Sequence, residues 1–192
     1  MRRVLLLSAV VVFMAAPAFS QSFMPTFELG ASGGINFPTG TISDGMKNGF
    51  GLNANAGYRA IEMLVVGAEF GYYGNGAKDD LLAASGIGGI DTRILQFTGM
   101  AKLMMPVMQA HNIYGKGVAG LYNVKQTFED MPLFGSGDVS DTKFGAGIGA
   151  GLRVNGVSKA SFYIEGMFHN VFGDTEDLRF FATTAGVLVA LP

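Results

Sequence analysis

The stretch of sequence that decides the fold reads Gly49-Phe50-Gly51-Leu52-Asn53-Ala54-Asn55-Ala56-Gly57-Tyr58-Arg59. Successive side chains of an extended strand point to opposite faces. The aromatic, leucine and alanine side chains therefore share one face, and the glycines, both asparagines and the arginine share the other. A soluble sheet can show this alternation too, but here it recurs along the chain and nothing is left over to cover the apolar faces.

Eight segments follow this pattern well enough to be predicted as strands. They span residues 27–37, 49–59, 64–73, 93–104, 112–125, 142–154, 160–170 and 179–191. Each is about the 9–11 residues, or slightly more, that a tilted strand needs to cross a membrane. Tight turns alternate with longer connections rich in Gly, Asp and Ser. We therefore predict an all-β fold, an eight-stranded antiparallel up-and-down transmembrane β-barrel with an apolar outside and a polar inside.

The first twenty residues are predicted to be a cleaved signal peptide. Arg2 and Arg3 supply the charged start, an apolar run follows, and Ala18-Phe19-Ser20 forms a small-x-small cleavage site. The apolar run is short for a membrane anchor, which needs about 20 residues. We therefore expect residues 21–192 to form the barrel domain in the bacterial outer membrane.

The composition supports a membrane barrel and excludes several other classes of protein. The chain is 49% hydrophobic and 15% charged, which is apolar for a soluble secreted domain. It has no cysteine, so a disulfide scaffold and thiolate chemistry are excluded. There is no phosphate-binding glycine loop and no zinc-ligand spacing, and the net charge of -2 gives no nucleic-acid footprint. We expect no cofactor, no metal and no nucleic-acid partner.

Three stretches carry a resemblance to a known family: Gly33-Gly34-Ile35-Asn36-Phe37-Pro38-Thr39-Gly40, Gly57-Tyr58-Arg59 and Gly67-Ala68-Glu69-Phe70-Gly71-Tyr72-Tyr73. With them the chain resembles the eight-stranded outer membrane protein β-barrel family, which includes the OmpA transmembrane domain, OmpX and opacity-type proteins. The resemblance implies a non-enzymatic role in envelope integrity, adhesion or host and environmental contact, carried by the surface loops.

The same resemblance implies assembly by the barrel-assembly machinery, which reads an aromatic residue at the end of family members. This chain instead ends in Val189-Ala190-Leu191-Pro192. The signal is either degenerate here or depends on Phe180 and Phe181.

Strand parity sends many ionisable side chains into the barrel. They are Glu28, Arg59, Glu69, Lys102, Lys116, Lys143, Arg153, Glu165 and His169. Eight strands enclose a space that side chains fill, and buried charges must be paired. We expect a structural ion-pair plug in which Glu69 and Glu165 meet Lys102 and Lys116 near the centre. The alternative is a narrow ion path gated by those pairs.

The long connections carry most of the acidic residues, so the predicted outer rim is acidic. Arg93, Lys125 and Arg179 lie near this rim and face outward by parity. They can be solvated charges at strand ends. Alternatively, they contact lipopolysaccharide phosphates while rim acids hold bridging divalent cations.

The sequence also bears on two further classes of function. A lipid A hydrolase needs a histidine base near the outer leaflet. His111 lies at the opposite rim, and His169 faces the lumen in Met167-Phe168-His169-Asn170-Val171, which lacks the serine of a deacylase His-x-Ser-Asn run. A soluble lipocalin-like carrier requires outward Phe and Leu side chains in water. We therefore predict no catalytic site, a monomer in lipid and lipopolysaccharide, and an extracellular ligand bound by the loops.

Overall fold

The computed structural model describes residues 26–79, 82, 89–108, 111–131, 135–156, 160–173 and 176–191. Its strands are β1 (Thr26–Thr39), β2 (Gly49–Ile61), β3 (Leu64–Gly76), β4 (Gly89–Met108), β5 (His111–Met131), β6 (Gly135–Asn155), β7 (Ala160–Val171) and β8 (Leu178–Leu191), with a short 3-10 helix η2 (Gly40–Asp44). The predicted signal peptide lies outside the described residues. No helix of the described residues is long and apolar enough to cross a membrane.

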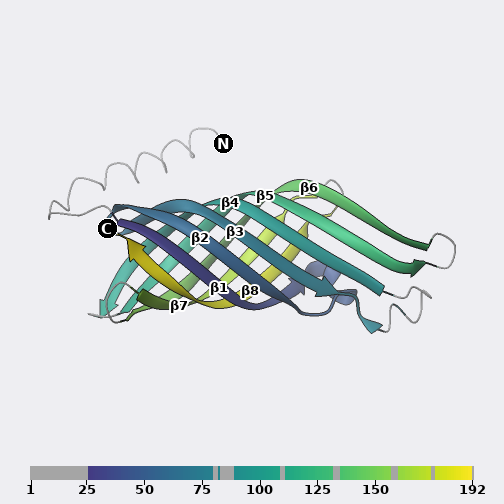
Figure 1. The fold of residues 1–192 in the computed structure, drawn as a ribbon, viewed down its shortest axis with the longest axis horizontal. Helices are drawn as coiled ribbons and strands as arrows, with labels where there is room; N and C mark the ends of the chain where they lie inside the picture. Colours follow the sequence, from purple (N-terminus) through teal and green to yellow (C-terminus); the bar gives the residue numbers. More distant parts are fainter. Residues whose placement is uncertain are drawn as a thin grey trace.

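The strands form one closed antiparallel barrel in chain order (Figure 1). Each strand pairs with its neighbours in sequence, and β1 pairs with β8 from Phe27 opposite Leu191 to Thr39 opposite Arg179. Closure lets the backbone groups of the barrel wall bond to one another, which a strand in hydrocarbon requires. The predicted fold is therefore confirmed.

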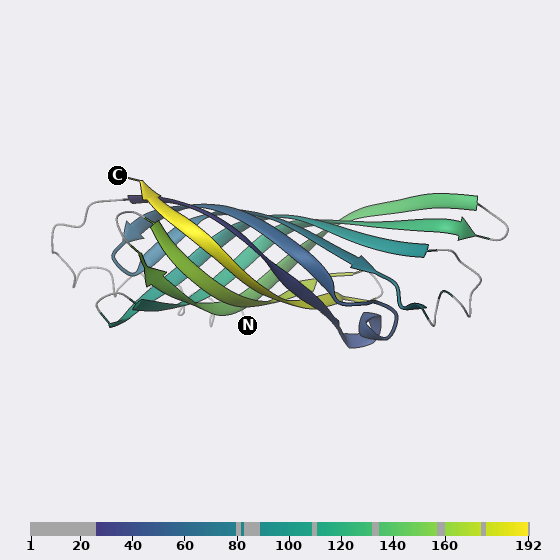
Figure 2. The same ribbon diagram turned by 60° about the horizontal axis from the view of Figure 1, so that its bottom comes forward.

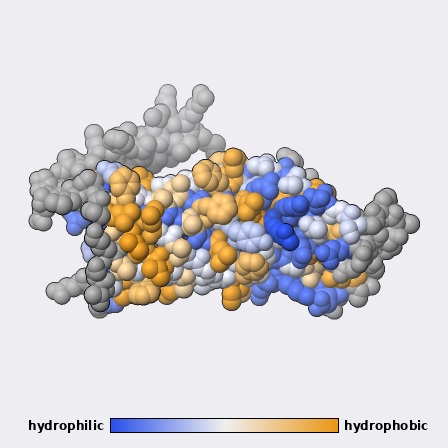
Figure 3. Space-filling model, viewed as in Figure 1, coloured by the Kyte–Doolittle hydropathy of each residue, from blue (hydrophilic) through white to orange (hydrophobic). Residues whose placement is uncertain are grey.

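The outside of the barrel is apolar, and the inside holds the polar side chains. Ile148 is 72% exposed, Phe97 65% and Phe162 60%, whereas Glu69 is 2% exposed and Lys116 3%. Figure 3 shows apolar residues over the barrel body and a hydrophilic zone toward the end where β4, β5 and β6 project. This distribution is the reverse of a soluble protein and matches a barrel whose outer face meets lipid.

β5 and β6 continue as a hairpin beyond the ends of β7 and β8 (Figure 2). We call residues 121–131 of β5 and 135–144 of β6 the outer hairpin; Leu121 lies opposite Phe144 at its base and Met131 opposite Gly135 near its tip. β4 runs beside it, with Gly89 opposite Glu129.

The sequence predicted these strands too short at this rim: it began β4 at residue 93 instead of Gly89, ended β5 at residue 125 instead of Met131, and began β6 at residue 142 instead of Gly135. The Gly, Asp and Ser of residues 126–141 indicated a loop. Outside the membrane, however, a strand needs no apolar face, so polar composition does not end it.

Candidate functional site

A buried ion cluster lies at the centre of the lumen. Lys116 of β5 donates hydrogen bonds to Glu69 of β3 and to Glu165 of β7, the second at 2.7 Å from Nζ to Oε1. All three side chains are at most 5% exposed. Tyr114 donates its hydroxyl to Glu165 Oε2 at 3.0 Å, and Gln96 Nε2 donates to Glu69 Oε1 at 3.3 Å. Both carboxylates therefore have a cation and a neutral donor, which offsets their desolvation.

A second buried cluster lies toward the rim where β1 begins and β8 ends. Glu28 accepts hydrogen bonds from Arg59 and from Arg153, the latter at 2.8 Å from Nη1 to Oε1. Arg153 was predicted to be an interior residue, and the structure places it across the lumen from β1. One carboxylate shared by two guanidinium groups leaves this cluster with one net positive charge.

Lys102 corrects the predicted central network. The prediction paired it with Glu69 or Glu165, but among the described residues no carboxylate lies at ion-pair distance from it. Its Nζ instead lies 3.5 Å from Asn55 Oδ1 and 5.7 Å from the ring centres of Tyr114 and Tyr163. The reason is register: Lys102 and Lys116 are direct cross-strand partners, and Lys116 occupies the position between the two carboxylates.

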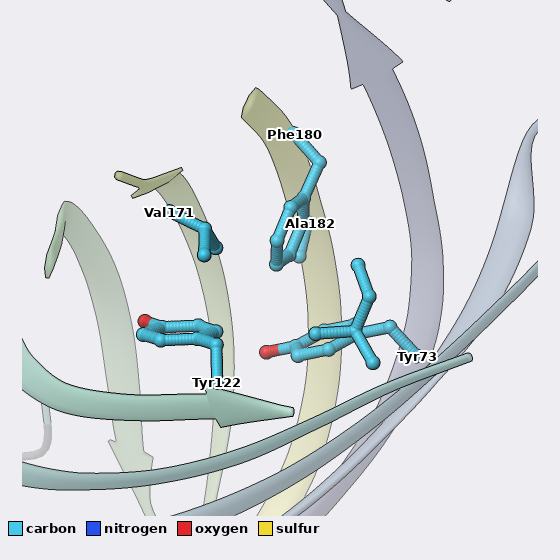
Figure 4. Packing of buried hydrophobic residues seen from close by; sticks show 6 residues of the cluster. Tyr73, Tyr122, Val171, Phe180 and Ala182 are labelled. Atoms are coloured by element: carbon cyan, nitrogen blue, oxygen red, sulfur yellow. The ribbon is translucent and has the colours of Figure 1, made fainter. Parts of the chain in front are cut away.

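An aromatic layer lies between the central ion cluster and the outer mouth. Tyr73, Tyr122, Val171, Phe180 and Ala182 converge there from four strands (Figure 4). His169 belongs to the same layer, since its ring stacks on Phe180 at 4.6 Å and its Nδ1 lies 3.0 Å from the Tyr122 hydroxyl. His169 therefore contacts aromatic side chains in the interior of the barrel rather than lying at the lipid surface.

Sequence reasoning missed the hydrogen bonds that Tyr73 makes in the lumen and the pairing of Asn36 with Asn75. Tyr73 donates to Asn53 Oδ1 at 3.0 Å and lies 3.1 Å from Gln96 Oε1. Asn36 and Asn75 bond to each other through both amides, at 2.8 and 3.0 Å. Strand parity already turned Tyr73 inward, so the signal was present, but partner identity needed the register across the barrel.

The three predicted outer cations do not form one group. Arg93 and Lys125 are direct cross-strand partners on β4 and β5, whereas Arg179 lies on β8. Lys125 pairs with Asp138 at 2.7 Å, and Arg179 pairs with Asp177 at 3.2 Å. Within the described part of the chain, no carboxylate lies at ion-pair distance from Arg93.

Two paired acids of the rim, Asp138 and Asp177, have pKa values lowered in the direction that favours their ionised form. The hydrogen bond and charge of Lys125 lower the pKa of the Asp138 carboxyl. Hydrogen bonds from Asn170, from Arg179 and from the Gly173 amide lower the pKa of Asp177. Lys143, predicted to be interior, lies partly exposed at the outer mouth and pairs with Asp141 at 3.3 Å. No group of three or more His, Asp or Glu residues in the described chain could hold a metal ion.

A closed antiparallel barrel with an apolar outside and a paired, ionised interior defines a membrane-spanning β-barrel protein. The family model of the outer membrane protein beta-barrel domain matches residues 6–190, and the chain belongs to this family. Membership places the protein in the outer membrane. A search of curated protein sequences found no significant match.

Two solved structures support the same fold. Neisserial surface protein A (NspA) is similar with a TM-score of 0.64 at 16% identity, covering 87% of this chain and 99% of that one. A major outer membrane protein from Thermus thermophilus has a TM-score of 0.60 at 10% identity, covering 88% and 100%. Ail, the attachment invasion locus protein of Yersinia pestis, also matches, with a TM-score of 0.49 at 20% identity, covering 85% and 97%.

Proposed function

We propose that this chain is a non-enzymatic outer-membrane surface protein whose outer hairpin and loops bind a partner outside the cell. The observation that carries the proposal is the outer hairpin, which continues as paired strands to Met131 and Gly135, beyond the end of β7 at Val171. A hairpin of this length is not needed to close the barrel, so it supports a role in contact.

The filled lumen supports the same proposal, in which the barrel anchors the protein and the outer hairpin and loops make the contact. The aromatic layer and the Lys116 cluster occupy the cross-section that a substrate or solute needs. The barrel then serves as an anchor, and lipopolysaccharide around it and the barrel-assembly machinery that inserts it are its expected partners in the envelope. We further propose that the anchored protein is a monomer.

Attachment of whole cells tests the proposal. Cells that display the full chain are compared with cells in which residues 126–141 are replaced by a two-residue Asn-Gly turn, on cultured epithelial cells and on glass. We expect attachment to fall at least tenfold in the shortened variant. Heat-dependent gel mobility checks that both barrels fold. Equal attachment by two folded barrels would refute a role for the outer hairpin.

A narrow ion path is the second candidate function. Buried ionisable groups follow one another through the lumen, from Glu28 and Arg153 past Lys102 to the Lys116 cluster. Such a series of charges is the feature that an ion path requires.

A further inference from the structure

Lys102 is a buried lysine whose charge has no partner of opposite sign. The residue is 3% exposed, and within the described part of the chain no carboxylate lies at ion-pair distance from its ammonium group. Its Nζ lies 3.5 Å from Asn55 Oδ1, the outer limit of a hydrogen bond, and 5.7 Å from the ring centres of Tyr114 and Tyr163. Contacts of this kind offset less than the cost of burying an unpaired ammonium group.

The two tyrosines place the Lys102 ammonium group in the part of the lumen that Arg153 also enters. Tyr114 lies on β5 and Tyr163 on β7, and Arg153 lies on β6 between these two strands. Arg153 is the direct cross-strand partner of Tyr163, and Tyr114 lies opposite Gly151 on the same strand as Arg153. A lysine that faces both rings therefore has this guanidinium group as a neighbour.

The charges of the lumen do not balance. Between the aromatic layer and the rim where β1 begins, the described residues supply four cations and three carboxylates to the lumen. They are Lys102, Lys116, Arg59 and Arg153 against Glu28, Glu69 and Glu165. One positive charge is therefore left over. Because Lys116 lies between its own two carboxylates, the excess falls on Lys102 and the two arginines.

Two guanidinium donors in the same region have no acceptor. The Nε atoms of Arg59 and Arg153 are both buried, and neither has a hydrogen-bond partner among the described residues. A buried donor without an acceptor is costly, and more so when it belongs to a charged group. The side chain of Arg59 is 25% exposed, so this region is accessible from the rim.

We propose that the region bounded by Lys102, Arg59 and Arg153 binds one small monovalent anion, with the chemistry of chloride. One such ion balances the charge of the lumen and accepts hydrogen bonds from the Lys102 ammonium group and from the two Nε–H groups. The side chains that fill an eight-stranded barrel leave no room for a large anion. The site lies at the end of the barrel opposite the outer hairpin, so it is independent of the surface contact proposed above.

Unfolding by urea tests the site with chloride as the probe. The mature chain, folded in nonionic micelles, is unfolded in mixtures of sodium gluconate and sodium chloride at constant ionic strength, because gluconate is too large to enter the lumen. An ion that binds only the folded state raises the ratio of folded to unfolded protein by one plus the ratio of its concentration to Kd. We expect a rise of about tenfold between zero and about 150 mM chloride. Broadening of the chloride NMR line by the folded protein measures the same binding without unfolding.

Matched variants locate the site. Lys102→Met removes the unpaired ammonium group and should abolish the response to chloride, although in gluconate it should be at least as stable as the unaltered chain. Arg153→Lys keeps the charge but has no Nε–H, so we expect it to bind chloride several-fold more weakly. Lys125→Met removes an exposed lysine of the outer rim and should respond to chloride as the unaltered chain does.

The anion site is overturned if chloride stabilises Lys102→Met as much as the unaltered chain, because the response is then a general effect of the salt. It is equally overturned if chloride changes neither the unfolding nor the NMR line of the unaltered chain, because Lys102 is then held without a counter-ion. Heat-dependent gel mobility shows whether each variant folds. The line width of the unaltered chain stays decisive if one of them does not.

Discussion

The ion pairs of Lys116 connect strands that are not neighbours in the barrel wall. It lies on β5, and its two carboxylate partners lie on β3 and β7, across the lumen. Arg153 of β6 reaches Glu28 of β1 in the same way. Ladder hydrogen bonds join adjacent strands only, so these cross-lumen pairs brace the barrel where the sheet itself cannot.

The substitution Lys116→Met is expected to lower the free energy of unfolding by about 3–5 kcal/mol, because it leaves Glu69 and Glu165 buried without a cation. Urea unfolding in micelles measures the loss. Lys102→Met is the matched control, since it removes a buried lysine that has no carboxylate partner among the described residues, and we expect little loss or a gain. Equal losses in the two variants would contradict the central place of Lys116.

The outer cations give a second prediction. We expect the triple variant R93Q/K125Q/R179Q to lower the thermal midpoint in lipopolysaccharide but not in plain detergent, because phosphate is present only in the first medium. Arg93 and Lys125 adjoin, so the double variant R93Q/K125Q should carry most of the loss. A loss of equal size in both media would mean that these side chains serve only their own acidic neighbours.

Among the elements, the connection from β7 to β8 depends on one carboxylate. Asp177 accepts from Asn170 Nδ2 at 3.2 Å and from the Gly173 amide at 3.3 Å. These bonds lower the pKa of Asp177, so their contribution is complete above its ordinary value of 3.8 and is lost only as pH falls through the lower folded value.

We therefore expect the Gly173 amide resonance to stay constant from neutral pH down to about pH 4 and to move only below it. The variant Asp177→Asn keeps a side-chain oxygen but cannot titrate, so its Gly173 resonance should not follow this step. A Gly173 transition centred well above pH 4 in the unaltered protein would contradict the sign of the shift.

The sequence predicts the elements well where lipid constrains them. In β2, the alternation from Gly49 to Arg59 is forced by hydrocarbon on one side and the lumen on the other, and the strand runs from Gly49 to Ile61. Outside the membrane that constraint ends, so the continuation of β5 to Met131 left no signal of period two in apolar residues. Strand parity predicts that both Lys102 and Lys116 point into the lumen. Which of the two lysines pairs with Glu69 and Glu165 depends on the register between β4 and β5 and on where both carboxylates lie.

At the scale of the whole molecule, the lumen and the outer mouth are separated by the aromatic layer. Tyr73 packs on Phe180 at 4.8 Å between ring centres, His169 stacks on Phe180 at 4.6 Å, and the rings of Tyr73 and His169 lie 5.7 Å apart. An ion crossing the barrel has to pass this layer and then the Lys116 cluster. Moving the aromatic layer or the Lys116 cluster out of the way breaks packing contacts and hydrogen bonds. Water cannot replace these contacts, because side chains already fill the lumen.

We therefore expect the purified protein to give no steady openings in a planar bilayer, and Glu69→Gln to change nothing. This variant removes the negative charge of Glu69, but Lys116 keeps its ion pair with Glu165, so the barrel should stay folded. Conductance is recorded at both voltage polarities, and a pore-forming outer-membrane protein inserted by the same procedure shows that insertion succeeds. Steady openings of the unaltered chain whose size or selectivity changes in Glu69→Gln would replace the plug with an ion path and make the second candidate function the first.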